Sequence, residues 1–351
     1  MSDTYAMYSA EQEELRAAVR QVLAAHEGAA AWAPLAGQVG VAGLAVPEQY
    51  GGFGAGDAEL AVVAEELGRS LSPVPFLDSA VLVPRALVAS GDREACARLL
   101  PGLAEGTRTA SSAWAEGGGV EWEPGRVRAH AVLDHGEWRV AGTKEHLLAP
   151  GDDLLVVART ERHGPSLFHV PATADDVRLT PVPTMDDTRP QWRAELLRAP
   201  ATPVGELGDA ERVLEEAMAA GCLALAADAV GGAGAVFELT LRYAKDREQF
   251  GRPIGSFQAV KHRLADLFTE LESARSLLLA AVHGEIPAGA AKAACCETYE
   301  HVAGEAIQLH GGIAITWEHP AHRYFKRAHS AARLLGSPAW HRRRLPLPSL
   351  T

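Results

Sequence analysis

Residues 242–267, RYAKDREQFGRPIGSFQAVKHRLADL, carry the pattern that identifies the fold of this chain. Small or apolar residues recur at helical spacing as far as Phe250, and Gly251 and Pro253 then mark a turn. The helical period resumes at Phe257 and continues to the end of the stretch. The pattern therefore predicts two helices joined by a tight turn.

Basic residues flank this predicted turn, namely Arg247, Lys261 and Arg263. An arginine beside a helix end presents a planar fork of N–H donors that suits a pyrophosphate. The alternative is a surface hairpin whose basic side chains are simply solvated. A charge cluster alone favours that alternative, so a second feature of the chain has to decide.

A second segment, residues 306–328, reads AIQLHGGIAITWEHPAHRYFKRA. Gly311 and Gly312 would let a backbone approach a nucleotide closely, and Gln308 can both donate and accept hydrogen bonds. An isolated pair of glycines usually marks a turn, whereas two long segments in a fixed order are much more specific.

Both segments resemble, in order, the flavin-contacting signatures of acyl-CoA dehydrogenases, and the resemblance extends over nearly the whole chain. In that family the two segments reach the ADP half of an FAD. The resemblance therefore implies FAD as the cofactor and an acyl-CoA or another acyl thioester as the substrate. The candidate FAD contacts are Arg247, Phe250, Gln258, Gln308 and Gly312.

The composition describes a large folded protein with an acidic surface. The 351 residues are 47% hydrophobic, which is enough for a sizeable core. A net charge of −12 argues against binding to nucleic acid or to anionic membranes. We expect a cytoplasmic protein, because no signal peptide is evident and no apolar run approaches a membrane span. The four cysteines lack metal-ligand spacing, so we expect buried thiols and no metal site.

The change of hydrophobic period along the chain predicts three domains. Helical periodicity covers residues 1–106, short strand-like runs separated by turns cover 107–203, and helical periodicity returns over 204–351. The expected fold class is α+β and mainly α. The resemblance further implies a β-barrel for the middle domain and a four-helix bundle for the last one.

The general base of the family is missing from both of its usual positions. These enzymes use a glutamate to remove the α-proton of the thioester, and that proton transfer is worth ~10²–10⁴-fold in rate. Counting from Gly311 places Leu335 at one such position, and counting back from Arg247 places Gly221 at the other. The remaining candidates for a base are Glu318 and three histidines, His310, His319 and His322.

The middle domain also lacks residues with which the family contacts the flavin. The family often has Lys-x-Trp-Ile-Thr/Ser, with a hydroxyl near flavin N5, where this chain has KEHLL at residues 144–148. Leu148 stands in place of the hydroxyl. Residues 111–119, SSAWAEGGG, match the family's flavin-holding element poorly, and Trp114 is expected to pack in the core.

In the tetramers of this family each FAD is shared between two subunits. This chain keeps the segments that contact a neighbour's FAD and lacks those that hold its own. The leading hypothesis is a subunit of a heteromeric acyl-CoA dehydrogenase that completes the FAD site of a homologous, base-carrying partner for α,β-desaturation, as in bacterial steroid side-chain degradation. The alternatives are a homomeric flavoenzyme whose base lies elsewhere and a scaffold that binds no flavin.

Overall fold

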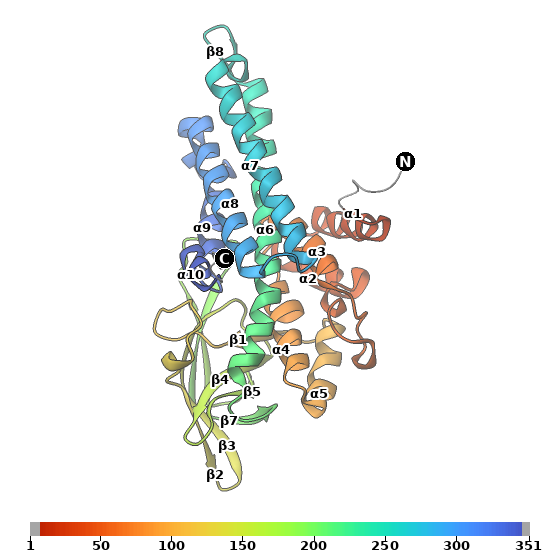
Figure 1. Cartoon of the computed structure of the whole chain (residues 1–351), viewed down its shortest axis with the longest axis vertical. Helices are drawn as coiled ribbons and strands as arrows, with labels where there is room; N and C mark the ends of the chain where they lie inside the picture. Colours follow the sequence, from red (N-terminus) through yellow and green to blue (C-terminus); the bar gives the residue numbers. More distant parts are fainter. Residues whose placement is uncertain (1–7, 346–351) are drawn as a thin grey trace, which may run out of the picture.

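The computed structural model describes residues 8–345 and shows three regions, in which the N-terminal helices and the sheet lie beside the lower part of a long helical bundle (Figure 1). Short helices form the first region, a sheet forms the second, and long helices form the third. The central helix of the third region, α6 (Ala210–Asp246), runs along both other regions. The predicted order of a helical, a β and a second helical region is confirmed. The predicted domain limits stay predictions, and their outer ends, residues 1 and 351, lie outside the described residues.

The N-terminal region is built from helices joined by tight turns. α1 begins with a capping box, in which Ser9 and Gln12 satisfy each other's backbone N–H groups. A short π-helical segment, Leu77–Leu82, faces α6. The helices are α1 (Ala10–Ala25), α2 (Trp32–Pro34), α3 (Asp57–Arg69), α4 (Val83–Ala89) and α5 (Arg93–Ala104).

The middle region is a closed barrel with two extra strands. Strands pair around the ring in the order β4, β2, β3, β7 and β5, and β5 pairs with β4 again to close it. β1 joins parallel to β4, and β6 joins antiparallel to β7. The strands are β1 (Ala110–Ala113), β2 (His130–Asp134), β3 (Glu137–Leu147), β4 (Asp153–Thr160), β5 (Gly164–Pro171), β6 (Val177–Val182) and β7 (Gln191–Val204).

The C-terminal region is a bundle of α6, α7 (Gln258–Val282), α8 (Ala288–His310) and α9 (Ala321–Arg333), followed by α10 (Pro338–Arg344). The helical pattern at Phe250 is not borne out, because α6 already ends at Asp246. A two-strand hairpin, β8 (Glu248–Gln249) and β9 (Arg252–Pro253), follows instead and places Phe250 at a positive φ of 54°. Ile254 N–H donates to the Arg247 carbonyl and closes this hairpin.

Helix α6 is the core helix of the molecule. By length and composition it could span a membrane, so the expectation that no apolar run approaches a span is wrong as stated. Most of its apolar window is buried against the rest of the protein, however, which is the ordinary state of a core helix. Its small residues allow close packing. A Cβ on Gly231 would lie 1.9 Å from the Glu65 carbonyl oxygen of α3, so the two backbones are in contact.

Three apolar clusters form the core. One joins the N-terminal helices to the bundle, and another fills the barrel. The remaining cluster lies where the three regions meet, and it contains Leu82, Cys222 and Leu335. The four cysteines are buried thiols without disulfides, as expected. Among residues 8–345 no group of three or more His, Cys, Asp or Glu side chains has a geometry that could hold a metal ion.

Candidate functional site

The two positions at which the sequence predicts a missing general base contact each other. Gly221 lies in the middle of α6, and Leu335 lies in the loop between α9 and α10. A Cβ built on Gly221 would be 2.6 Å from Leu335 Cδ1 and 2.6 Å from Leu82 Cδ2. The two positions were obtained from separate counts along the sequence. Their meeting at one point supports the assignment of the family's base positions to Gly221 and Leu335. Leucine side chains fill the space in which a carboxylate would have to act.

The loop that carries Leu335 is held in place by buried polar groups. The Lys292 ammonium donates to the carbonyl oxygens of Ala332 and Gly336, at 2.9 and 2.5 Å. His341 Nε2 donates to the Leu335 carbonyl oxygen at 3.0 Å. Burial, followed by the charge of Lys292, lowers the pKa of His341 to about 4, so its ring is neutral near pH 7.

Other side chains of the same cluster close the side of this site that faces the barrel. Trp122 is buried and belongs to the cluster, and Trp114 and Leu148 pack against it. The two tryptophan rings meet edge to face, with centroids 6.3 Å apart. The expectation that Trp114 packs in the core is met only in part, because its side chain is half-buried at the edge of the cluster. No hydroxyl group stands at Leu148, and aromatic and aliphatic side chains occupy this junction, so these residues do not fit an isoalloxazine ring held by this chain.

A buried ion pair fixes the segment that differs from the flavin-holding element. Lys144 is fully buried, and its ammonium contacts Glu116 at 2.5 Å. Burial lowers the pKa of Lys144 to about 8, although the charge of Glu116 opposes this shift. Glu116 also accepts from the backbone N–H groups of Arg128 and Ala129. The pair ties the segment after β1 to the barrel wall.

Sequence reasoning missed Asp78, a buried carboxylate next to this junction. It accepts from the Ser112 hydroxyl at 2.5 Å and from the Leu148 N–H at 3.3 Å. Burial raises the pKa of Asp78 to about 6, while these hydrogen bonds oppose the shift. A single acid inside the apolar run PFLDSAV was the available signal. Both oxygens are used to hold the N-terminal helices against the barrel.

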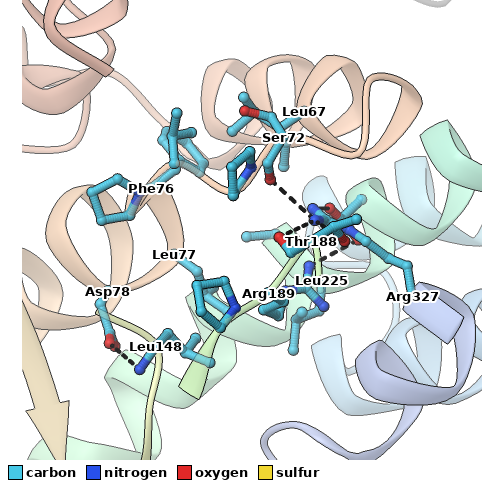
Figure 2. Close-up of a pocket in the computed structure, with 17 residues that line it drawn as sticks. Leu67, Ser72, Phe76, Leu77, Asp78, Leu148, Thr188, Arg189, Leu225 and Arg327 are labelled. Atoms are coloured by element: carbon cyan, nitrogen blue, oxygen red, sulfur yellow. Dashed lines mark hydrogen bonds and ion pairs between the residues drawn. The ribbon is translucent and has the colours of Figure 1, made fainter. Parts of the chain in front are cut away.

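A cavity of about 40 Å³ lies beside Asp78, between the N-terminal region, α6 and α9 (Figure 2). Its polar side is the carboxylate of Asp228, which meets Arg189 at 3.0 Å and Arg327 at 2.5 Å. Arg327 also donates to the carbonyl oxygens of Ser72 and Thr188. The cavity has room for about one water molecule. It is too small for an acyl chain. Its ion pairs join the middle and C-terminal regions, and the hydrogen bond from Arg327 to Ser72 adds the N-terminal region.

The candidate FAD contacts lie at the other end of the bundle, and all of them are exposed. Arg247 and Phe250 lie in the hairpin after α6, and Gln258 begins α7. Gln308 and Gly312 lie at the end of α8, which runs back to the same end because it is antiparallel to α7. Phe250 is 92% exposed. The structure therefore brings the five residues to one end of the bundle, but it does not test their role.

This end of the bundle fits the ADP half of an FAD. Within residues 8–345 the Arg247 side chain forms no ion pair or hydrogen bond, so its donors face solvent. A Cβ on Gly312 would have no neighbour within 4 Å, which leaves the backbone open to a ligand. Gly311 has φ 66° and ψ −145°, a conformation that glycine adopts readily, and it ends α8.

The substitute bases suggested by the sequence lie far from Leu335. Glu318 and His319 precede α9, and His322 begins it, whereas Leu335 follows it. The 13 residues of α9 span roughly 20 Å at 1.5 Å per residue. His310 lies at the end of α8, beside His319. None of these four side chains can reach the space above Gly221.

Comparisons with known proteins agree with this geometry. The family model for the acyl-CoA dehydrogenase N-terminal domain matches residues 9–107, and the model for the C-terminal domain matches residues 208–345. The chain belongs to the acyl-CoA dehydrogenase family. It is 37% identical to the acyl-CoA dehydrogenase IpdE2 of Mycobacterium tuberculosis, over 95% of this chain and 96% of that protein.

Two solved structures of this family are similar over nearly their whole length. The steroid ACAD Tcur3481–Tcur3483, as a G363A variant, is 32% identical with a TM-score of 0.82, covering 95% of this chain and 96% of that one. The ChsE4–ChsE5 complex from Mycobacterium tuberculosis is 29% identical with a TM-score of 0.83, covering 96% of each chain. The resemblance to the subunits of heteromeric acyl-CoA dehydrogenases is confirmed.

Proposed function

We propose that this chain is the accessory subunit of a heteromeric acyl-CoA dehydrogenase. Its exposed bundle end would complete the FAD site of a homologous partner that carries the glutamate, and the partner would desaturate the acyl-CoA. The observation that carries this proposal is the contact of Leu335 with Gly221, which fills this chain's own site while the candidate FAD contacts remain exposed.

The similar structures also support a heteromeric assembly and a bulky substrate. One of them is described as a steroid ACAD, and the other as a complex of two named subunits. We infer by analogy a heterotetramer in the cytoplasm that acts on a steroid-like acyl-CoA. When bound, FAD would accept the hydride from the β-carbon of the thioester. The residues of this chain would hold the ADP half of the cofactor, with Arg247 at the pyrophosphate.

A second candidate function is a homomeric flavoenzyme that has its base elsewhere. Asp78 is the observation in its favour, because the carboxylate lies beside Leu148 and its pKa of about 6 is that of a group able to exchange protons near neutral pH. Its full burial and its two hydrogen bonds argue against this role. The isolated chain would then retain FAD, and an acyl-CoA would bleach the flavin absorbance.

The Arg247→Ala variant tests the accessory role. Charge-assisted hydrogen bonds to the pyrophosphate are worth about 1.5–3 kcal/mol, so the variant complex should retain FAD roughly tenfold less well or worse. Gln308→Ala should have a smaller effect. The measurement is FAD per complex after dialysis, on complexes captured with the tagged chain from cells that also make its partner.

Arg178→Ala is the matched control, because Arg178 is an exposed arginine on β6 of the barrel, away from the bundle end. It should leave the FAD content unchanged. If a correctly assembled Arg247→Ala complex also keeps its FAD, the shared-site proposal is wrong and the scaffold that binds no flavin becomes the better explanation.

A further inference from the structure

Three aromatic rings pack one after another at the end of the bundle that carries the candidate FAD contacts. The rings of Tyr243 and His310 stack with their planes 28° apart and their centroids 4.4 Å apart. The ring of His319 follows with its centroid 4.5 Å from that of His310, and its plane is tilted by 56°. The three residues come from the last turn of α6, the last turn of α8 and the segment before α9. The stack therefore joins three elements that are far apart in the sequence.

Hydrogen bonds fix the central ring of this stack. His310 Nδ1 donates to the Ala306 carbonyl oxygen at 2.8 Å. The Tyr243 hydroxyl donates to the His310 carbonyl oxygen at 3.4 Å, so Tyr243 holds both the ring and the backbone of His310. His319 Nδ1 accepts from the Ala321 N–H at 3.2 Å. These bonds leave each ring little freedom to turn.

The stack lies between the two segments that would contact the FAD. The Arg247 N–H donates to the Tyr243 carbonyl oxygen at 2.8 Å, so the position of Tyr243 sets the start of the hairpin. On the other side, Gln308 and Gly312 are each two residues from His310 in the sequence. A shift of His310 relative to Tyr243 would therefore change the spacing between Arg247 and these two residues.

We propose that Tyr243, His310 and His319 form a positioning stack that holds the two FAD-contacting segments at the spacing a partner's FAD requires, and that the stack needs an uncharged His310. This proposal rests on the proposed function above. His310 is a positioning residue here, because it acts through Arg247, Gln308 and Gly312.

The surroundings of His310 disfavour a charged ring. With Nδ1 donating to Ala306, Nε2 is unprotonated in the neutral ring, and within residues 8–345 this buried atom has no hydrogen-bond partner. A proton on Nε2 would thus create a buried N–H without an acceptor. The titratable groups facing the ring are Tyr243 from α6 and His319 before α9, with His322 next to His319. None of the ion pairs of the described chain involves His310.

The direction of the pH effect follows from this. Burial lowers the pKa of His310 below its ordinary value of 6.5, and burial, followed by His310 and His322, lowers the pKa of His319. A histidine whose pKa is depressed by folding contributes stability that is complete above its ordinary pKa and is lost as the pH falls below it. The wild-type complex should therefore release FAD more readily below about pH 6.5.

Two substitutions at His310 test the proposal in the captured complex. His310→Ala removes the central ring and should lower FAD retention about three- to tenfold, the factor that corresponds to one displaced hydrogen bond. His310→Phe keeps an aromatic ring that cannot take up a proton. It should retain FAD as the wild type does at about pH 7.5, and lose less of it than the wild type at about pH 5.5. FAD per complex after dialysis is measured at both pH values.

His283→Asn is the matched control, because His283 is exposed and follows α7 at its opposite end. It should show the wild-type pH dependence. The positioning proposal is overturned if His310→Ala retains FAD like the wild type, or if His310→Phe neither restores retention nor reduces the acid sensitivity. If His310→Ala does not assemble, the FAD retention of His310→Phe at the two pH values decides whether the positioning proposal holds.

Arg247→Ala separates this proposal from the proposed function. Loss of FAD in Arg247→Ala together with unchanged retention in His310→Ala would overturn the positioning stack alone. Unchanged FAD in both variants would overturn the accessory role itself.

Discussion

The chain purified by itself is expected to show no acyl-CoA dehydrogenase activity with an artificial electron acceptor. The family's reaction needs a carboxylate beside the α-carbon, and the two positions predicted to supply it hold Gly221 and Leu335, which contact each other. Proton transfer by a positioned side chain is worth ~10²–10⁴-fold, and the apolar contacts around Leu82 also leave no space for substrate. The measurement is dye reduction with acyl-CoA thioesters of different size, including a steroid-like one.

Leu335→Glu should not restore activity, which makes it an informative companion variant. Leu335 is 6% exposed, so a glutamate there would be buried against Leu82 without a partner. Leu148 would still leave the flavin side of the junction without its hydroxyl. A family member that carries the glutamate is the positive control. Turnover by the wild-type chain at roughly 1–10³ s⁻¹, the range of ordinary enzymes, would show that a base is present, and Asp78→Asn would be the first variant to examine.

Asp228→Asn is expected to destabilise the fold more than any surface substitution. Asp228 is buried and forms ion pairs with Arg189 and Arg327, which are buried as well. Removing one partner of a buried ion pair costs about 3–5 kcal/mol of the free energy of unfolding, since the remaining charges stay buried without compensation. The urea midpoint of unfolding, followed by tryptophan fluorescence, measures the loss.

Asp246→Asn is the matched control, because Asp246 is an exposed residue at the end of the same helix. It should change the free energy of unfolding by less than about 0.5 kcal/mol. Equal midpoints for the two variants would contradict the structural importance of the Asp228 ion pairs.

The same ion pairs predict the pH dependence. Burial alone would raise the pKa of Asp228, but Arg327 and Arg189 hold it below the ordinary value of 3.8. A carboxylate with a depressed pKa contributes stability that is complete above its ordinary pKa and is lost as the pH falls through the folded value. The stability difference between wild type and Asp228→Asn should therefore shrink below about pH 4.

The fold class and the two candidate FAD-contacting segments could be predicted from the sequence because their signals are local. Helical and strand-like periods show up within a single segment, and the resemblance in residues 242–267 and 306–328 rests on contiguous residues. The absence of a glutamate at Leu335 is likewise visible by counting from a nearby motif. The local pattern did not show where α6 ends, because Asp246 is followed by a hairpin whose hydrogen bond between Ile254 and Arg247 overrides the helical period.

The sequence by itself determined the family and the order of the three regions, and it predicts the loss of both usual base positions. Only the tertiary structure decided that Leu335 closes the space above Gly221, that Asp228 binds two arginines 39 and 99 residues away, and that His310 stacks on Tyr243. Such contacts depend on how α6 packs against elements from every part of the chain. The periodicity of a segment shows which face it buries, but it does not show which distant side chain that face will meet.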